Sequence, residues 1–169
     1  LGELAANIAK KTRTEDIAAY TRVLKTDPNN PLRHDAVAML YMQDGRLREA
    51  VDEFRQSLRL NKDSAPTHYN LGIVLSMLRR YPEAMREYEA AVKIDPAHAE
   101  AHNNLGAMLH VNGELDQAAV HYRRAIELRP DNTEARANLG RLLMLQGKAA
   151  AAATEFEQTI AIQPDAIPA

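Results

Sequence analysis

The sequence predicts an all-α fold in which antiparallel helix pairs stack in tandem as an α-solenoid, and three observations support this prediction. Proline recurs every 34 residues at Pro96, Pro130 and Pro164, with Pro28 two periods earlier. Apolar residues within each 34-residue unit follow helical spacing twice. Three more columns keep the same step: Gly72, Gly106 and Gly140; Ala50, Ala84, Ala118 and Ala152; and Phe54, Tyr88, Tyr122 and Phe156, with Tyr20 upstream. Such a period is typical of a solenoid, whose units bury their apolar faces by stacking.

Each unit is expected to contain two helices separated by a glycine and closed by the proline. Gly45, Gly113 and Gly147 lie where a helix end needs a left-handed backbone. The residue before a proline is forced out of the helical region, so the second helix ends there. The expected pairs are 32–44 with 47–60, 66–78 with 82–94, 100–112 with 116–128, and 134–146 with 149–162.

The columns of small residues have a packing explanation. A glycine costs helix stability, so its repetition at residue 72, 106 and 140 predicts that a facing helix approaches too closely for a side chain. We expect the alanine column to face these glycines, and the Phe/Tyr column to fill the space between one helix pair and the next.

With these columns the chain resembles the tetratricopeptide repeat family, whose 34-residue unit carries a Leu-Gly pair, a later Ala, an aromatic residue and a closing Pro. Leu105-Gly106, Ala118, Tyr122 and Pro130 supply these in one unit. The resemblance implies a right-handed superhelix of about four and a half repeats in a single domain over 1–169. Its expected units are a partial repeat at 1–30 and full repeats at 31–64, 65–98, 99–132 and 133–166. Three positions depart from the pattern, namely Ala38, Lys62 and Arg79, and the geometry can absorb each at modest cost.

Composition limits the function classes. The 169 residues are 46% hydrophobic and 26% charged, which is the balance of a folded protein. A net charge of -2 and a pI near 6.3 disfavour nucleic acid as a partner. No apolar run is long enough to insert into a membrane. The compartment is undetermined, with the cytoplasm favoured, and a targeting segment could precede Leu1.

In the tetratricopeptide repeat family the first helix of each unit lines a concave groove, so the resemblance implies that a partner binds there. One column of that groove is Asn70, Asn104 and Asn138. A side-chain amide both donates and accepts, so this column could hydrogen-bond to the backbone of an extended peptide. Alternatively, the asparagines only bond the adjacent turn or face water. The other residues expected to contact the partner are Tyr69, Ile73, Met77, Asn103, Met42, His110 and Arg141.

Some of these residues have a structural alternative. Methionines adapt to varied apolar partners, but Met39 and Ile73 could equally belong to the interhelical core. A subset of the family clamps the carboxylate of chaperone tails with lysines, which this groove lacks. Asp35, Glu100 and Glu134 occupy groove positions instead, so we expect acidic tails to be repelled.

The sequence predicts no catalytic residues and no cofactor. His98 and His102 lie four apart, but no third metal ligand is near in sequence, so zinc is not expected. His34, His68 and His102 recur with the repeat and are interpreted as structural. No phosphate-binding loop or nucleophile motif is present.

Three functions remain in view. The first is a protein–protein interaction scaffold that binds a partner peptide or helix in its groove. The second is the noncatalytic, substrate-presenting arm of a protein O-glycosyltransferase or another larger enzyme, because similar asparagine columns occur there. A helical RNA reader is third, opposed by the strict period and the acidic pI. End-to-end self-association is also expected if the last helix pair is left uncovered.

Overall fold

The computed structural model describes residues 15–162, all of whose regular structure is helical. Residues 15–26 are helical, whereas the expected elements at 1–14 and the closing Pro164 lie outside the described residues. The remaining helices are α2 (Pro31–Gln43), α3 (Leu47–Leu60), α4 (Ala65–Met77), α5 (Tyr81–Ile94), α6 (Ala99–Val111), α7 (Leu115–Leu128), α8 (Thr133–Leu145) and α9 (Ala149–Ile162). Every expected boundary is confirmed to within one residue. Over residues 15–162 no helix has the length and apolar character needed to cross a membrane.

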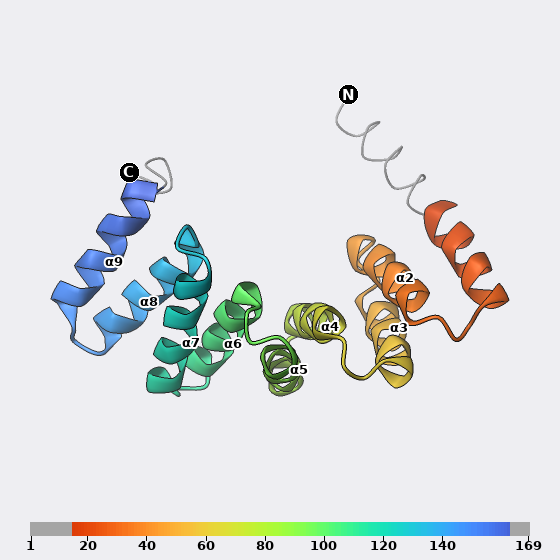
Figure 1. Ribbon diagram of the computed structural model, residues 1–169, viewed down its shortest axis with the longest axis horizontal. Coiled ribbons are helices and arrows are strands. Elements are labelled where there is room, and N and C mark those ends of the chain that lie inside the picture. Colours follow the sequence, from red (N-terminus) through yellow and green to blue (C-terminus); the bar gives the residue numbers. More distant parts are fainter. Residues whose placement is uncertain (1–14, 163–169) are drawn as a thin grey trace, which may run out of the picture. The chain divides into compact units, whose positions relative to one another are not determined.

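The chain divides into two compact units between Ile94 and Asp95. In unit 1, which ends at Ile94, α2 packs on α3, α4 packs on α5, and α3 also contacts α4 (Figure 1). In unit 2, which begins at Asp95, α6 packs on α7, α8 packs on α9, and α8 contacts both α6 and α7. We call the first helix of each pair the A helix and the second the B helix. The expected full repeats begin at the first residue of each A helix.

The A helices begin where a polar side chain caps free backbone N–H groups. Asn30 accepts a hydrogen bond from the Leu32 N–H, and Ser64 accepts one from the Thr67 N–H. Asn132 accepts from the Ala135 N–H at 3.0 Å. At α6 the cap is His98, whose Nδ1 accepts from the Ala101 N–H at 3.3 Å. These contacts satisfy donors that have no partner within the helix, so they fix where each A helix starts.

A left-handed residue follows every A helix, as predicted for the three glycines. Gly45, Gly113 and Gly147 have φ of 77°, 84° and 72°. In the repeat that lacks the glycine, Arg79 adopts a φ of 59°, so the arginine keeps the same turn despite its Cβ. The Arg80 N–H bonds the Leu75 carbonyl at 2.9 Å, which closes the turn as the same bond does in the glycine-containing repeats.

The glycines are closely approached, as expected, but the aromatic column packs differently from the expectation. A Cβ added at Gly72 would lie 2.6 Å from the Tyr88 ring, and one at Gly140 would lie 2.6 Å from Phe156. At Gly106 the nearest atoms are again ring carbons, those of Tyr122 at 2.9 Å. The aromatic ring of the same repeat is thus the nearest neighbour of all three glycines, and at Gly106 the Ala118 backbone carbonyl also lies 3.2 Å from the added Cβ, as expected if the alanine column faces the glycines. The rings pack inside each helix pair, and the fully buried alanines permit close approach.

Candidate functional site

In unit 1 the expected contact residues share one face of α4. Asn70, Ile73 and Met77 follow each other at helical spacings of three and four, which places them on one side of the helix. Asn70 and Ile73 are half-buried, and the Met77 side chain is 55% exposed. Among residues 15–162 the Asn70 amide has no hydrogen-bond partner. This amide is free to bind an external peptide group.

Tyr69 and Met42 flank this face. The Tyr69 ring centroid lies 6.1 Å from that of Tyr88, with the rings tilted by 50°, so the half-buried tyrosine is partly held by the core. Met42, near the end of α2, is half-buried. The two A helices of this unit are joined by the Asp35 carboxylate, which accepts a hydrogen bond from the Thr67 hydroxyl at 2.8 Å. The Asp35 charge therefore serves a structural contact as well as lining the face.

In unit 2 the corresponding residues form a polar cluster between α6 and α8. The Asn138 amide donates to the Asn103 side-chain carbonyl at 3.0 Å, and the Asn138 carbonyl accepts from the Arg141 guanidinium. Asn103 is only 3% exposed, so Asn138 is hydrogen-bonded to a buried side chain. Asn104 is half-buried and is also engaged in an interaction. The three asparagines of the column thus differ, since Asn138 already uses a donor and an acceptor within the protein.

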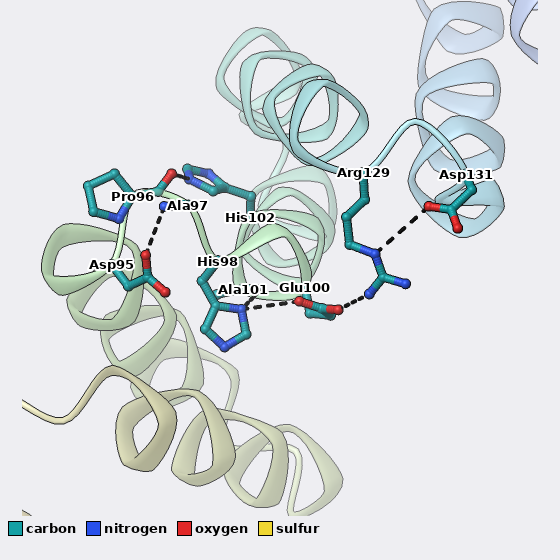
Figure 2. Close-up of polar contacts among 9 residues, drawn as sticks. All are labelled: Asp95, Pro96, Ala97, His98, Glu100, Ala101, His102, Arg129 and Asp131. Atoms are coloured by element: carbon teal, nitrogen blue, oxygen red, sulfur yellow. Dashed lines mark hydrogen bonds and ion pairs between the residues drawn. The ribbon is translucent and has the colours of Figure 1, made fainter.

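An ion-pair network lies at the start of α6, and Figure 2 shows its members. The Glu100 carboxylate pairs with the Arg129 guanidinium, which also lies 3.9 Å from the Asp131 carboxylate. The backbone N–H at Glu100 and the Arg129 side chain lower the pKa of the Glu100 carboxyl. Arg129 therefore offsets the negative charge of Glu100, a predicted groove residue. We expect the repulsion of acidic partners to be weaker here.

The last positions of three A helices, α4, α6 and α8, carry exposed apolar side chains that recur with the repeat. Met77 is 55% exposed, Val111 is 72% exposed and Leu145 is 68% exposed. His110, beside Val111, is half-buried. Exposed apolar groups that recur at one repeat position are suited to contacting a partner, whereas single scattered ones carry no such meaning.

Sequence reasoning missed a second periodic contact, which we call the clip. In each full repeat the side chain at the fourth residue of the A helix bonds a side chain 19 positions later on the B helix and a backbone carbonyl six positions earlier. The four pairs are His34 with Glu53, His68 with Glu87, His102 with His121, and Arg136 with Glu155. The signal was available, because the B-helix partners also recur every 34 residues.

The clip explains why the histidines recur. His68 Nδ1 lies 2.7 Å from a Glu87 carboxylate oxygen, and its Nε2 lies 3.0 Å from the Lys62 carbonyl. The hydrogen bond to Glu87 raises the pKa of His68, against the opposing effect of burial. The clip therefore ties both helices of a pair to the loop before them, and the structural interpretation of these histidines agrees with their contacts. Within residues 15–162 no group of three or more His, Asp or Glu side chains is arranged to bind a metal ion.

Comparison with known families and structures assigns the fold. Models of the tetratricopeptide repeat match residues 38–78 and 80–113, residues 99–132, and residues 121–153. A search of curated proteins gave no match. The chain belongs to the tetratricopeptide repeat family, and it is a protein-interaction domain of that family. Each matching model describes the repeat, and none describes a catalytic domain.

Several solved structures share this fold. MamA is 25% identical with a TM-score of 0.86, and the match covers 94% of this chain and 93% of MamA. YrrB, described as a TPR protein with an unusual peptide-binding site, is 24% identical with a TM-score of 0.79, over 97% of this chain and 84% of YrrB. PilF of Pseudomonas aeruginosa is 18% identical with a TM-score of 0.81, over 93% of this chain and 72% of PilF. At these identities YrrB and PilF establish the fold alone.

Proposed function

We propose that the chain is a scaffold that binds an extended segment of a partner protein on the exposed faces of its A helices. The observation that supports this most strongly is the α4 face. There the Asn70 amide, which has no partner among residues 15–162, lies on the same side of the helix as half-buried Ile73 and exposed Met77. A free amide beside apolar side chains can hydrogen-bond a peptide group while the apolar side chains bury those of the peptide.

In unit 2 the polar cluster gives the A-helix faces a second set of contacts. Asn138 and Arg141 are already bonded to each other, so a peptide would have to share or replace these bonds. Arg141 is exposed and brings a positive charge, and Leu145 brings apolar surface one turn further along α8. We expect unit 2 to favour a partner segment with a carboxylate near an apolar residue. That all three asparagines line one groove stays a prediction.

Selection from a phage-displayed library of unstructured peptides tests this proposal. The selected peptide should bind the unsubstituted chain and the Asn61→Ala variant equally, because Asn61 is an exposed asparagine at the end of α3. The Asn70→Ala/Asn104→Ala/Asn138→Ala variant should bind at least about tenfold more weakly, the loss expected from about 1.4 kcal/mol. Unchanged affinity in the triple variant would remove the asparagine column from the proposed site.

The noncatalytic arm of a protein O-glycosyltransferase is the alternative, and the asparagine column is the observation that favours it. In that case the bound segment would be the enzyme's acceptor substrate. The gene sequence that flanks this region discriminates the two, because a glycosyltransferase requires a catalytic domain in the same protein. An adjoining catalytic domain would favour the alternative, and its absence from the full gene would favour the scaffold.

Self-association has its own supporting observation. Val51 of α3 and Ala119 of α7 are 2% and 4% exposed, but the equivalent Ala153 of α9 is exposed, as is Ile160 at 41%. The B-helix position that α3 and α7 bury is thus exposed on α9 within residues 15–162, and a second copy could cover it. Light scattering over a range of concentrations tests this. A mass that rises with concentration supports self-association, and an Ala153→Glu variant should then stay monomeric, whereas a constant monomer mass contradicts it.

A further inference from the structure

The third repeat builds its clip from two histidines, where the other full repeats use a carboxylate on the B helix. His102 Nδ1 of α6 lies 2.9 Å from His121 Nδ1 of α7, and the two rings stack with centroids 5.1 Å apart and planes 29° apart. His102 Nε2 lies 3.3 Å from the Pro96 carbonyl, a contact that Figure 2 shows. His102 is 8% exposed and His121 is half-buried. The two helices are therefore joined here through two imidazoles, side chains whose unperturbed pKa lies near neutral pH.

Proton accounting shows which charge states this clip can hold. The Pro96 carbonyl accepts only, so His102 must carry its proton on Nε2 when it is neutral. His102 Nδ1 is then an acceptor, and His121 must donate from its own Nδ1. One added proton leaves the hydrogen bond intact. Both Nε2 atoms then carry a hydrogen, and the hydrogen between the two Nδ1 atoms can lie on either ring. A second added proton places an N–H on both facing nitrogens, so the hydrogen bond is lost and two positive charges lie side by side.

We propose that the His102–His121 clip is an acid-sensitive contact that holds α6 against α7 at neutral pH and opens under mildly acidic conditions. In the second repeat His68 faces Glu87 instead, and a proton on His68 strengthens that contact by creating an ion pair. Acid is therefore expected to act in opposite directions on the two clips. The acid sensitivity is a property of the α6–α7 pair and does not depend on whether the A helices bind a partner.

The surroundings of the two histidines favour their neutral forms, because they lower both pKa values. Burial is the largest cause that lowers the pKa of His102, and electrostatic interactions with Arg124 and His98 lower it further. The Pro96 carbonyl and the Asp95 carboxylate oppose this effect without reversing it. Burial and then His102 lower the pKa of His121. The charged groups that act on the pair come from α7, from the start of α6 and from the loop before it.

The direction of the pH effect follows from these shifts. When the folded state holds a histidine in its neutral form more strongly than the unfolded chain does, the unfolded chain binds more protons below its pKa of about 6.5. Stability is then present above about pH 6.5 and is lost as the pH falls through the folded-state pKa values. Each extra proton bound by the unfolded chain raises the unfolding equilibrium constant about tenfold per pH unit.

Urea unfolding of the full chain at about pH 7.5 and about pH 5.5 tests the proposal. The His121→Glu variant rebuilds the clip with the residue that other repeats use, and the Glu87→His variant places a histidine pair in the second repeat. All other titrating groups are common to the three proteins. On going to about pH 5.5 the unfolding constant should rise about tenfold more for the unsubstituted chain than for His121→Glu, and Glu87→His should be the most acid-sensitive of the three. Equal pH dependence of the unsubstituted chain and His121→Glu would overturn the proposal.

Nitrogen-15 NMR of the histidine side chains gives a second readout that does not depend on unfolding. At neutral pH the spectra should show His102 protonated on Nε2 and His121 protonated on Nδ1. During acid titration the pair should take up its protons in two separated steps, as coupled groups do. Two independent titrations with ordinary midpoints would contradict the proposed contact even if the chain remained folded throughout.

Discussion

Replacing Gly106 with leucine should disrupt the packing inside the third repeat. A Cβ at this position would lie 2.9 Å from two carbons of the Tyr122 ring and 3.2 Å from the Ala118 backbone carbonyl. Tyr122 is 1% exposed, so its ring has little space into which it can move, and the carbonyl cannot shift without moving α7. Overpacking of this kind costs about 3 kcal/mol or more, and the improved helix propensity returns about 1 kcal/mol. We expect a net loss of about 2 kcal/mol or more.

Thermal and urea unfolding, followed by circular dichroism, measure this loss. For a chain of this size about 2 kcal/mol corresponds to a fall of roughly 4–8 °C in the thermal midpoint. Gln117→Leu is the matched control, because Gln117 is exposed on α7 and should change stability by no more than about 0.5 kcal/mol. A Tyr122→Leu background should reduce the cost of Gly106→Ala, since the smaller side chain leaves room for the Cβ. Equal shifts in Gly106→Leu and Gln117→Leu would refute the close approach of ring and glycine.

Three further substitutions test other contacts. Arg79→Gly should raise the urea midpoint. Relief of the strained left-handed backbone is worth about 1–2 kcal/mol, which exceeds the cost of about 0.5–1 kcal/mol from the greater entropy of the unfolded chain. A lower midpoint would contradict this. Glu87→Gln should destabilise the chain more at about pH 5.5 than at about pH 8.5. The raised pKa of His68 stabilises the fold below about pH 6.5, and this contribution is lost as the pH rises. Urea unfolding at both pH values measures the difference. Asn103→Ala should cost about 1–3 kcal/mol in urea unfolding, since it removes the buried acceptor of Asn138, and an unchanged midpoint would mean that the Asn103–Asn138 bond stabilises nothing.

The helices were predictable because their signals are local and repeated. Each A helix has its turn residue and its apolar spacing in sequence, so the boundaries could be read to within one residue. Arg79 was expected only as a departure that the geometry can absorb, and it does so by adopting the left-handed backbone of the missing glycine. The family assignment rested on the same repetition and agrees with the matching models.

Packing partners were harder to predict, because a period identifies equivalent positions but not what they face. The glycine and alanine columns both required close approach, and nothing in the sequence showed that the rings of Tyr88 and Phe156 would occupy the space beside the glycines. The clip was missed for a related reason. His34 and Glu53 lie 19 residues apart, and only the helix-pair geometry brings them to 2.6 Å.

The asparagine column shows how equivalence can mislead at a binding site. Residues 34 apart occupy the same place in each repeat, so one exposed amide predicted the others. The structure instead gives Asn138 two partners, Asn103 and Arg141, while Asn70 has none among residues 15–162. The difference comes from neighbours that do not repeat, because Arg141 stands where the earlier repeats have Ile73 and Ala107. The side chains around a repeated position therefore decide whether the residue there is free to bind a partner.

Backbone NMR of the chain during titration with a selected peptide tests the central claim most directly. If the A helices form the binding surface, the largest shift changes should fall on α4, α6 and α8, including Asn70, Met77 and Leu145. Residues exposed on the B helices, such as Gln117, should change little. Shift changes confined to α3, α5, α7 or α9 would contradict the proposed surface even if the peptide binds tightly.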